Sequence, residues 1–181
     1  KIHDIVVVFA GDPTLKTEDL IRLLQPLNNT TITGKIFLDA SLFKTPIHSP
    51  NLMLVDIGTE DGPPISSITI DKNLIIVTAT PGKLGKPAAL KNDRGYFIDS
   101  KVITTLEPTL IKSSVQNNRI EASGKINPKD HSLEFKLSPI NFDHYILYKI
   151  KSILKTTNIK GNAVITRNQA QLPKKLILLN T

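Results

Sequence analysis

The sequence has 181 residues, of which 40% are hydrophobic and 22% are charged, with no cysteine and no tryptophan. The apolar fraction is sufficient for a buried core, which excludes a disordered ground state. The lack of cysteine excludes disulfides and thiolate chemistry, and no stretch approaches the roughly twenty apolar residues of a transmembrane helix. The formal net charge of +7 suits nucleic acid, anionic lipid or an acidic protein as a partner, or solubility alone.

The sequence begins at Lys1 rather than at a methionine, and Lys1 directly precedes an apolar stretch. We therefore expect a signal peptide or a membrane anchor before Lys1 in the full-length protein. A chain of this length is expected to form a single β-rich domain over residues 1–181.

The N-terminal region predicts a strand, a helix and a second strand. Residues 5–9 are continuously apolar, as in a strand that is covered on both faces. Thr17 is the expected N-cap of a short amphipathic helix that ends at Pro26. Residues 32–43 alternate between apolar and polar side chains, which indicates a long strand with one buried face.

The middle of the chain predicts short strands separated by turns. Residues 52–55 form an apolar strand in this interpretation. Residues 65–70 and 74–79 predict a β-hairpin that turns at 71–73, where the residue types tolerate turn conformations. Residues 81–94 are rich in glycine, proline and lysine and predict a loop.

The region that follows again predicts strands. Residues 96–106 and 109–115 have strand character. Residues 119–126 and 132–138 predict a second hairpin, because both runs alternate and the intervening residues favour a turn. Asn117-Asn118 is a further candidate for a tight turn.

The C-terminal region predicts a second helix and two closing strands. Residues 143–155 carry apolar side chains on one helical face, and Asp143 is the expected N-cap. Strands are expected at 159–166 and 176–179.

A short helix followed by a strand that contains glycine occurs twice, in residues 14–43 and 143–167. The expected fold class is α+β and β-dominated, with a long, curved, mostly antiparallel sheet and two short helices packed on it. The helix residues expected in the core are Leu20, Leu23, Leu24, Ile146, Ile150, Ile153 and Leu154.

Asp56-Ile57-Gly58-Thr59 follows an apolar stretch and has some likeness to the Asp-Thr-Gly turn of aspartic proteases. That chemistry requires two carboxylates that share a proton. The sequence contains no second copy of the turn, so a homodimer would have to supply it. A dimeric hydrolase around Asp56 is therefore one alternative, against the simpler interpretation of an acidic turn.

The loop at 81–94 does not match a phosphate-binding loop, because the glycine spacing is wrong and Pro87 removes a donor. Its basic residues could instead contact a polyanion or an acidic partner. We predict no catalytic residue, no cofactor-binding residue and no metal ligand, and no cofactor. The four histidines show no metal-ligand spacing. The candidate contact residues are Lys83, Lys86, Lys91, Arg94 and Tyr96.

The two helix–strand units, and residues 120–126 followed by 133–139, carry a resemblance to known families. Residues 20–24 with 32–36, and 150–154 with 159–161, resemble the repeats of AsmA-like envelope proteins and of the type II secretion protein N family. The resemblance implies a periplasmic protein anchored to the inner membrane that serves secretion or lipid homeostasis. It supplies no catalytic residue.

The favoured hypothesis is thus a non-enzymatic envelope component that binds protein partners or lipid and could self-associate. The alternatives are a domain that binds nucleic acid or another polyanion through residues 83–94 and the dimeric hydrolase around Asp56. Nucleic acid is the less expected partner, because the aromatic residues are not interleaved with the basic ones.

Overall fold

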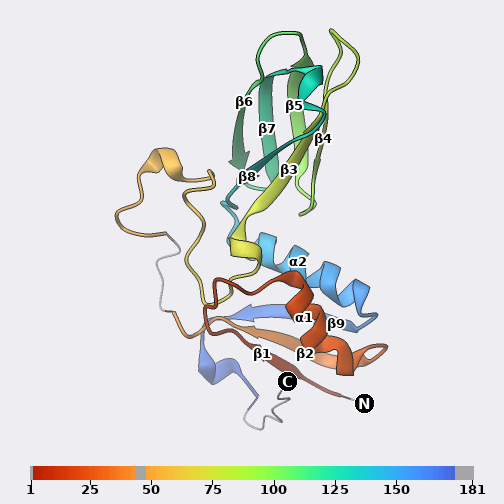
Figure 1. Cartoon of the computed structure of the whole chain (residues 1–181). Coiled ribbons are helices and arrows are strands. Elements are labelled where there is room, and N and C mark those ends of the chain that lie inside the picture. Colours follow the sequence, from red (N-terminus) through yellow and green to blue (C-terminus); the bar gives the residue numbers. More distant parts are fainter. Residues whose placement is uncertain (1, 44–47, 174–181) are drawn as a thin grey trace. The chain divides into compact units, whose positions relative to one another are not determined.

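The computed structural model describes residues 2–43 and 48–173 (Figure 1). Two compact units form within the chain. The first unit consists of Lys1–Ser49, Ile65–Lys72 and Asp143–Thr181, and the second of Pro50–Pro64 and Asn73–Phe142.

The first unit is a parallel three-stranded sheet with two helices. Its strands are β1 (Ile5–Val8), β2 (Thr31–Asp39) and β9 (Lys160–Thr166), in the spatial order β1-β2-β9. Both neighbouring pairs are parallel. The helices α1 (Thr17–Leu24) and α2 (Phe142–Thr156) lie on one face of this sheet (Figure 1).

The core of the first unit lies between this sheet face and the helices. On β2, Ile32, Ile36 and Leu38 are buried, whereas Thr33 and Lys35 on the other face are exposed. The predicted helix residues supply the opposite side of the core. Leu20, Leu24, Ile146, Ile150, Ile153 and Leu154 are buried, and Leu23 is partly buried.

The helix–strand unit identified twice in the sequence corresponds to α1 with β2 and to α2 with β9, and the two strands pair with each other. The glycine of each copy allows close contact. A Cβ atom on Gly34 would lie 2.5 Å from the carbonyl oxygen of His3, to which the Gly34 N–H donates a hydrogen bond of 2.6 Å. A Cβ atom on Gly161 would lie 2.8 Å from the Ile36 side chain. Any larger residue would push these groups apart.

The segment 65–72 is held in the first unit by one carboxylate. Asp71 accepts hydrogen bonds from the backbone N–H of Thr17 at 3.1 Å and from its hydroxyl at 2.6 Å. Lys149 on α2 forms an ion pair with the same carboxylate at 2.5 Å, and its side chain is only 7% exposed. The Thr17 hydroxyl, expected to cap its own helix, therefore binds Asp71 instead.

The ionised form of Asp71 is favoured in the folded protein. Burial alone would raise the pKa of Asp71, but hydrogen bonds from Lys149 and Thr17 and the positive charge of Lys149 outweigh it, so the pKa lies below its usual value. Asp71, Lys72 and Asn73 all have positive φ angles, between 50° and 60°. The chain turns there, as the residue types predict, but no hairpin follows.

The second unit contains two further three-stranded sheets. The first consists of β3 (Ile75–Thr80), β4 (Ala89–Asn92) and β8 (Leu133–Leu137), and both of its strand pairs are antiparallel. In the order β4-β3-β8, the central strand is β3.

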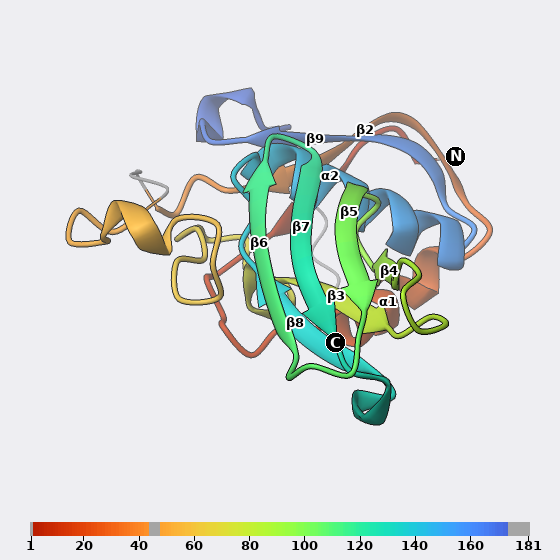
Figure 2. The same cartoon turned by 90° about the horizontal axis from the view of Figure 1, so that it is seen from above.

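The other sheet of the second unit has the order β5-β7-β6 (Figure 2). Its strands are β5 (Phe97–Thr104), β6 (Leu110–Gln116) and β7 (Arg119–Ile126). β5 runs parallel to β7, and β6 forms an antiparallel hairpin with β7. The hairpin turns at Asn117-Asn118, as predicted.

One apolar cluster joins both sheets of the second unit, so each sheet has one buried face and one outer face. Small residues let the sheets approach closely. The cluster contains Ala79, Ala88, Val102, Ala122 and Ile126, flanked by Leu90, Ile111, Leu133 and Phe135.

Five 3₁₀ turns complete the described elements: η1 (Gln25–Leu27), η2 (Leu54–Asp56), η3 (Asp71–Asn73), η4 (Pro128–Asp130) and η5 (Gln169–Gln171). Within the described ranges, no helix has the length and apolar content needed to cross a membrane.

The predicted α+β class with dominant strands and two helices is confirmed. The strands are distributed over three sheets rather than one long sheet. β1 is an edge strand with one covered face and partly exposed residues, not a strand covered on both faces. Asp143 lies in the first turn of α2 and pairs with Arg167 rather than forming the N-cap.

Both predicted hairpins outside β6–β7 are wrong, because the two segments of each expected hairpin do not pair with each other. Residues 65–70 form no strand, and β3 pairs with β4 and β8. β7 and β8 belong to different sheets. Residues 52–55 contain a 3₁₀ turn instead of a strand, and the predicted loop at 81–94 contains β4. The strand expected at 176–179 lies outside the described residues.

Replacing Ile150 with Asp should reduce the free energy of unfolding by at least about 3 kcal/mol, because a carboxylate would enter the core without a partner. Ile150 is 3% exposed. Chemical denaturation measures the loss. Leu147→Asp is the matched control, since Leu147 lies on the same helix and is 36% exposed. Equal losses for both variants would contradict the described packing of α2.

Replacing Asp71 with Asn should cost about 3 kcal/mol at pH 7, because it leaves Lys149 buried without its counter-charge. A lowered carboxyl pKa stabilises the fold above the unfolded pKa of about 4, and this stabilisation disappears as the pH falls through the folded pKa. The difference between wild type and variant should therefore shrink below about pH 4. Denaturation curves between pH 3 and pH 7 measure it.

Asp143→Asn provides the control for this prediction. The pair of Asp143 and Arg167 has side chains that are 48% and 38% exposed, so its loss should cost less than about 1 kcal/mol. A pH-independent difference for Asp71→Asn would show that its carboxylate does not act through its charge.

Candidate functional site

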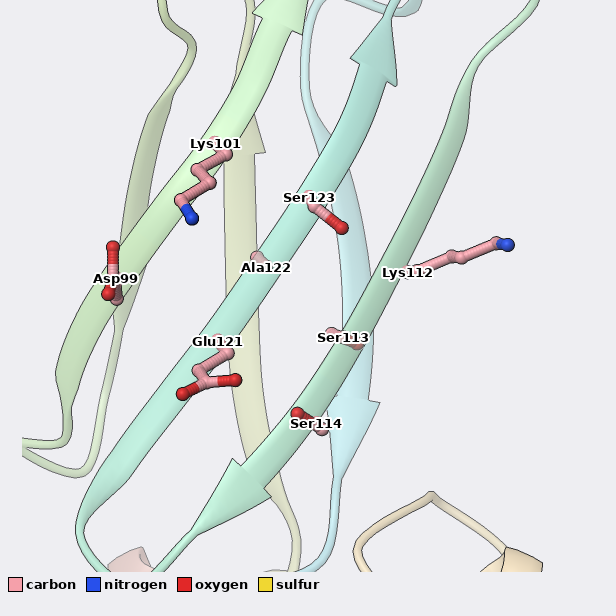
Figure 3. Close-up of a pocket in the computed structure, with 8 residues that line it drawn as sticks. All are labelled: Asp99, Lys101, Lys112, Ser113, Ser114, Glu121, Ala122 and Ser123. Atoms are coloured by element: carbon pink, nitrogen blue, oxygen red, sulfur yellow. The ribbon is translucent and has the colours of Figure 1, made fainter.

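The outer face of the β5-β7-β6 sheet forms a hollow with a volume of about 360 Å³. Figure 3 shows the residues that line it, and all three strands contribute. They are Asp99, Lys101, Lys112, Ser113, Ser114, Glu121, Ala122 and Ser123.

The strand register arranges the polar side chains of this face in rows. Asp99, Glu121 and Ser114 are direct neighbours across the three strands, and they form an acidic row. The next row, two residues along each strand, contains Lys101, Ser123 and Lys112 and is basic. The face therefore presents opposite charges side by side, with hydroxyl groups between them.

Only part of this charge is neutralised within the protein. Asp99 pairs with Arg119 at 3.4 Å, and the Arg119 guanidinium lies 5.1 Å from the centre of the Phe97 ring. Lys101, Lys112 and Glu121 form no ion pair with any residue in the described parts of the chain. In Figure 3, Lys101 lies over the hollow, whereas Lys112 extends away from it.

This arrangement is suited to binding rather than to covalent chemistry. A nucleophilic serine requires a base within hydrogen-bond distance, and among the described residues Ser123 has no hydrogen bond to either lysine of its row. The described ranges also contain no group of three or more His, Asp or Glu side chains placed to hold a metal ion.

The five residues predicted to contact a polyanion or a partner do not share one surface. Lys83, Lys86 and Lys91 are exposed. Arg94 and Tyr96 are each 4% exposed, and Arg94 forms an ion pair with Asp93. Two of the five side chains are therefore inside the protein, where a ligand on the surface does not reach them.

Asp56 lies at the end of η2, in a turn with a structural role. Its backbone carbonyl accepts a hydrogen bond from the Thr59 hydroxyl at 2.8 Å. The N–H of Gly58 donates to the hydroxyl of Ser138 at 3.1 Å. The first contact closes the turn, and the second attaches it to Ser138, the residue that directly follows β8.

The family model of the D-Ala-D-Ala carboxypeptidase 3 (S13) family matches residues 2–181. No curated protein sequence matches the chain.

Two solved structures share the fold, and both are of penicillin-binding protein 4 from Haemophilus influenzae. One has a TM-score of 0.70 and 18% identity, with 91% of this chain and 39% of that chain covered. The other, a complex with a β-lactam, has a TM-score of 0.62 and 20% identity, with 97% and 38% covered. This chain thus spans less than two fifths of the length of those proteins.

These findings correct the functional predictions. The resemblance to AsmA-like proteins and to the type II secretion protein N family is wrong, because the family model is that of a carboxypeptidase. A non-enzymatic scaffold in secretion or lipid homeostasis is wrong for the same reason, and so are the polyanion-binding domain and the aspartic-type hydrolase. The predicted periplasmic location agrees with the family, whereas the inner-membrane anchor stays a prediction.

The sequence motifs of penicillin-binding proteins could have indicated this family, but the chain does not contain the full set. These motifs are Ser-x-x-Lys, Ser-Asp-Asn and Lys-Thr-Gly. The sequence has Ser-x-x-Lys at Ser41 and at Ser152, but neither Ser-Asp-Asn nor Lys-Thr-Gly. Ser152 and Lys155 are exposed on α2. The match over residues 2–181 nevertheless extends across both units, and the chain belongs to the D-Ala-D-Ala carboxypeptidase 3 (S13) family.

Proposed function

We propose that this chain is part of a periplasmic carboxypeptidase that removes the terminal D-alanine from the peptide stems of peptidoglycan. The observation that carries this proposal is the family match over residues 2–181. The shared fold with penicillin-binding protein 4 supports it. In such enzymes a serine attacks the D-Ala-D-Ala peptide bond, releases D-alanine and forms an acyl-enzyme, which water then hydrolyses.

We also propose that the catalytic serine belongs to a part of the full-length protein outside these 181 residues. The coverage of 39% of the neighbouring structure and the incomplete motif set support this. The chain described here then supplies binding surfaces rather than the reacting groups. Protein partners in an envelope complex and an inner-membrane anchor remain further proposals for the full-length protein.

The full-length protein should release D-alanine from Nα,Nε-diacetyl-Lys-D-Ala-D-Ala, because the family acts on this type of peptide end. Enzymatic detection of free D-alanine measures the reaction. The corresponding L-Ala-L-Ala peptide is the control and should not be cleaved. Benzylpenicillin should block the release, since a β-lactam acylates the same serine. No release from this peptide or from isolated muropeptides would contradict the proposal.

Replacing Ser152 with Ala should change kcat/KM for D-alanine release by less than about twofold, because Ser152 is an exposed helix residue. Loss of a serine nucleophile typically reduces the rate by a factor of at least about 10³. A loss of that size for Ser152→Ala, with unchanged thermal stability, would place the nucleophile on α2.

A further inference from the structure

We infer that the outer face of β5, β7 and β6 is a binding site for a short peptide that carries both a free amine and a free carboxylate. The choice of peptide, the end of a peptidoglycan stem, rests on the proposed function. The existence of a site for such a zwitterion rests on the geometry of this face alone.

Folding alone does not favour the charge pattern of this face. Asp99 and Glu121 lie directly opposite each other on β5 and β7, and like charges in this position destabilise a sheet. Arg119 compensates Asp99 but leaves the Glu121 carboxylate without an ion pair in the described structure. A cationic ligand group would relieve this repulsion.

The spacing of the opposite charges matches a short zwitterionic peptide. Glu121 and Lys101 occupy adjacent rows of the register, which are two residues apart. Two residues of strand correspond to about 7 Å, and β5 and β7 are neighbouring strands about 5 Å apart, so the two residues are diagonal neighbours roughly 7–8 Å apart. A peptide end whose amine and carboxylate lie a similar distance apart can therefore bind Glu121 and Lys101 together. Ser114 and Ser123 lie in the same rows and offer hydroxyl groups to the peptide backbone.

The charges of this face disfavour other classes of ligand. A polyanion would meet the carboxylates of Asp99 and Glu121, which line the hollow. An uncharged glycan strand would leave Glu121 and Lys101 desolvated without a counter-charge, which is costly. A zwitterionic peptide satisfies both groups.

The test is isothermal titration calorimetry on the full-length protein with Nα-acetyl-Lys-D-Ala. This peptide has a free side-chain amine and a free carboxylate, and it lacks the D-Ala-D-Ala bond. Two blocked peptides are compared with it, one with an acetylated amine and one with an amidated carboxylate. Wild-type protein should bind each blocked peptide at least about tenfold more weakly, as expected for the loss of one charge-assisted hydrogen bond.

Two neutral variants of similar size assign the groups. In Glu121→Gln, the free and the amine-acetylated peptides should bind equally. In Lys101→Met, the free acid and the amide should bind equally. These paired comparisons distinguish a lost contact from a damaged fold. Glu134→Gln and Lys136→Met are the matched controls, since both residues are exposed on β8 in the other sheet of the same unit, and neither should change the preference.

The inference is overturned if the wild-type protein does not bind Nα-acetyl-Lys-D-Ala. It is also overturned if both variants still prefer the free peptide over the blocked peptides. The inference and the proposed function fail separately. Release of D-alanine without peptide binding to this face would overturn only the inference. If each variant loses its peptide preference as expected but the protein releases no D-alanine, the binding site is supported and the proposed carboxypeptidase activity is contradicted.

Discussion

The first unit depends on the partly buried carboxylate of Asp71. Three segments that are far apart in the sequence meet there: the start of α1 through Thr17, the segment 65–72, and α2 through Lys149. Strand pairing does not fix the segment 65–72, because it contains no strand. Its apolar residues Ile68 and Ile70 are fully buried, and the charge interaction sets the position at which they enter the core.

The same segment also makes hydrogen bonds to other parts of this unit. The backbone N–H of Gly11 donates to the Ser67 carbonyl at 2.8 Å, and that of Asp71 donates to Leu15 at 3.0 Å. The Tyr145 hydroxyl donates to the carbonyl of Ile70 at 3.1 Å.

The parallel sheet of the first unit is completed by β9, near the C-terminal end of the described chain. Its assembly therefore requires contacts of long sequence separation, which slow folding.

The sequence predicts those elements whose stability is local. The apolar face of α2 and the alternation of β2 are visible because helix and strand periods are properties of neighbouring residues. Strand pairing is not a property of neighbouring residues. β7 pairs in parallel with β5, which precedes it by about twenty residues, so adjacency in sequence wrongly suggests a hairpin with β8.

The candidate site could not be predicted for the same reason. Asp99, Lys101, Glu121 and Lys112 come from three strands, and only the register of β5, β7 and β6 places them in two rows. Taken singly, each is an ordinary polar residue on the outer side of a strand. The basic residues at 83–94 suggest a shared surface because they are close in sequence. Burial of Arg94 shows that closeness in sequence does not define a surface.

The contact between Tyr145 and Ile70 has an evolutionary consequence. The chain leaves the first unit after Lys72 and returns to it at Asp143. The contact between Tyr145 and Ile70 holds the point of exit and the point of return near each other. A segment with adjacent ends can be inserted into a host fold or exchanged without disturbing it. Residues 73–142 can thus be exchanged as one block, with another outer face, while the parallel sheet and its two helices are kept, provided that the new block still accommodates residues 50–64, which also belong to the second unit.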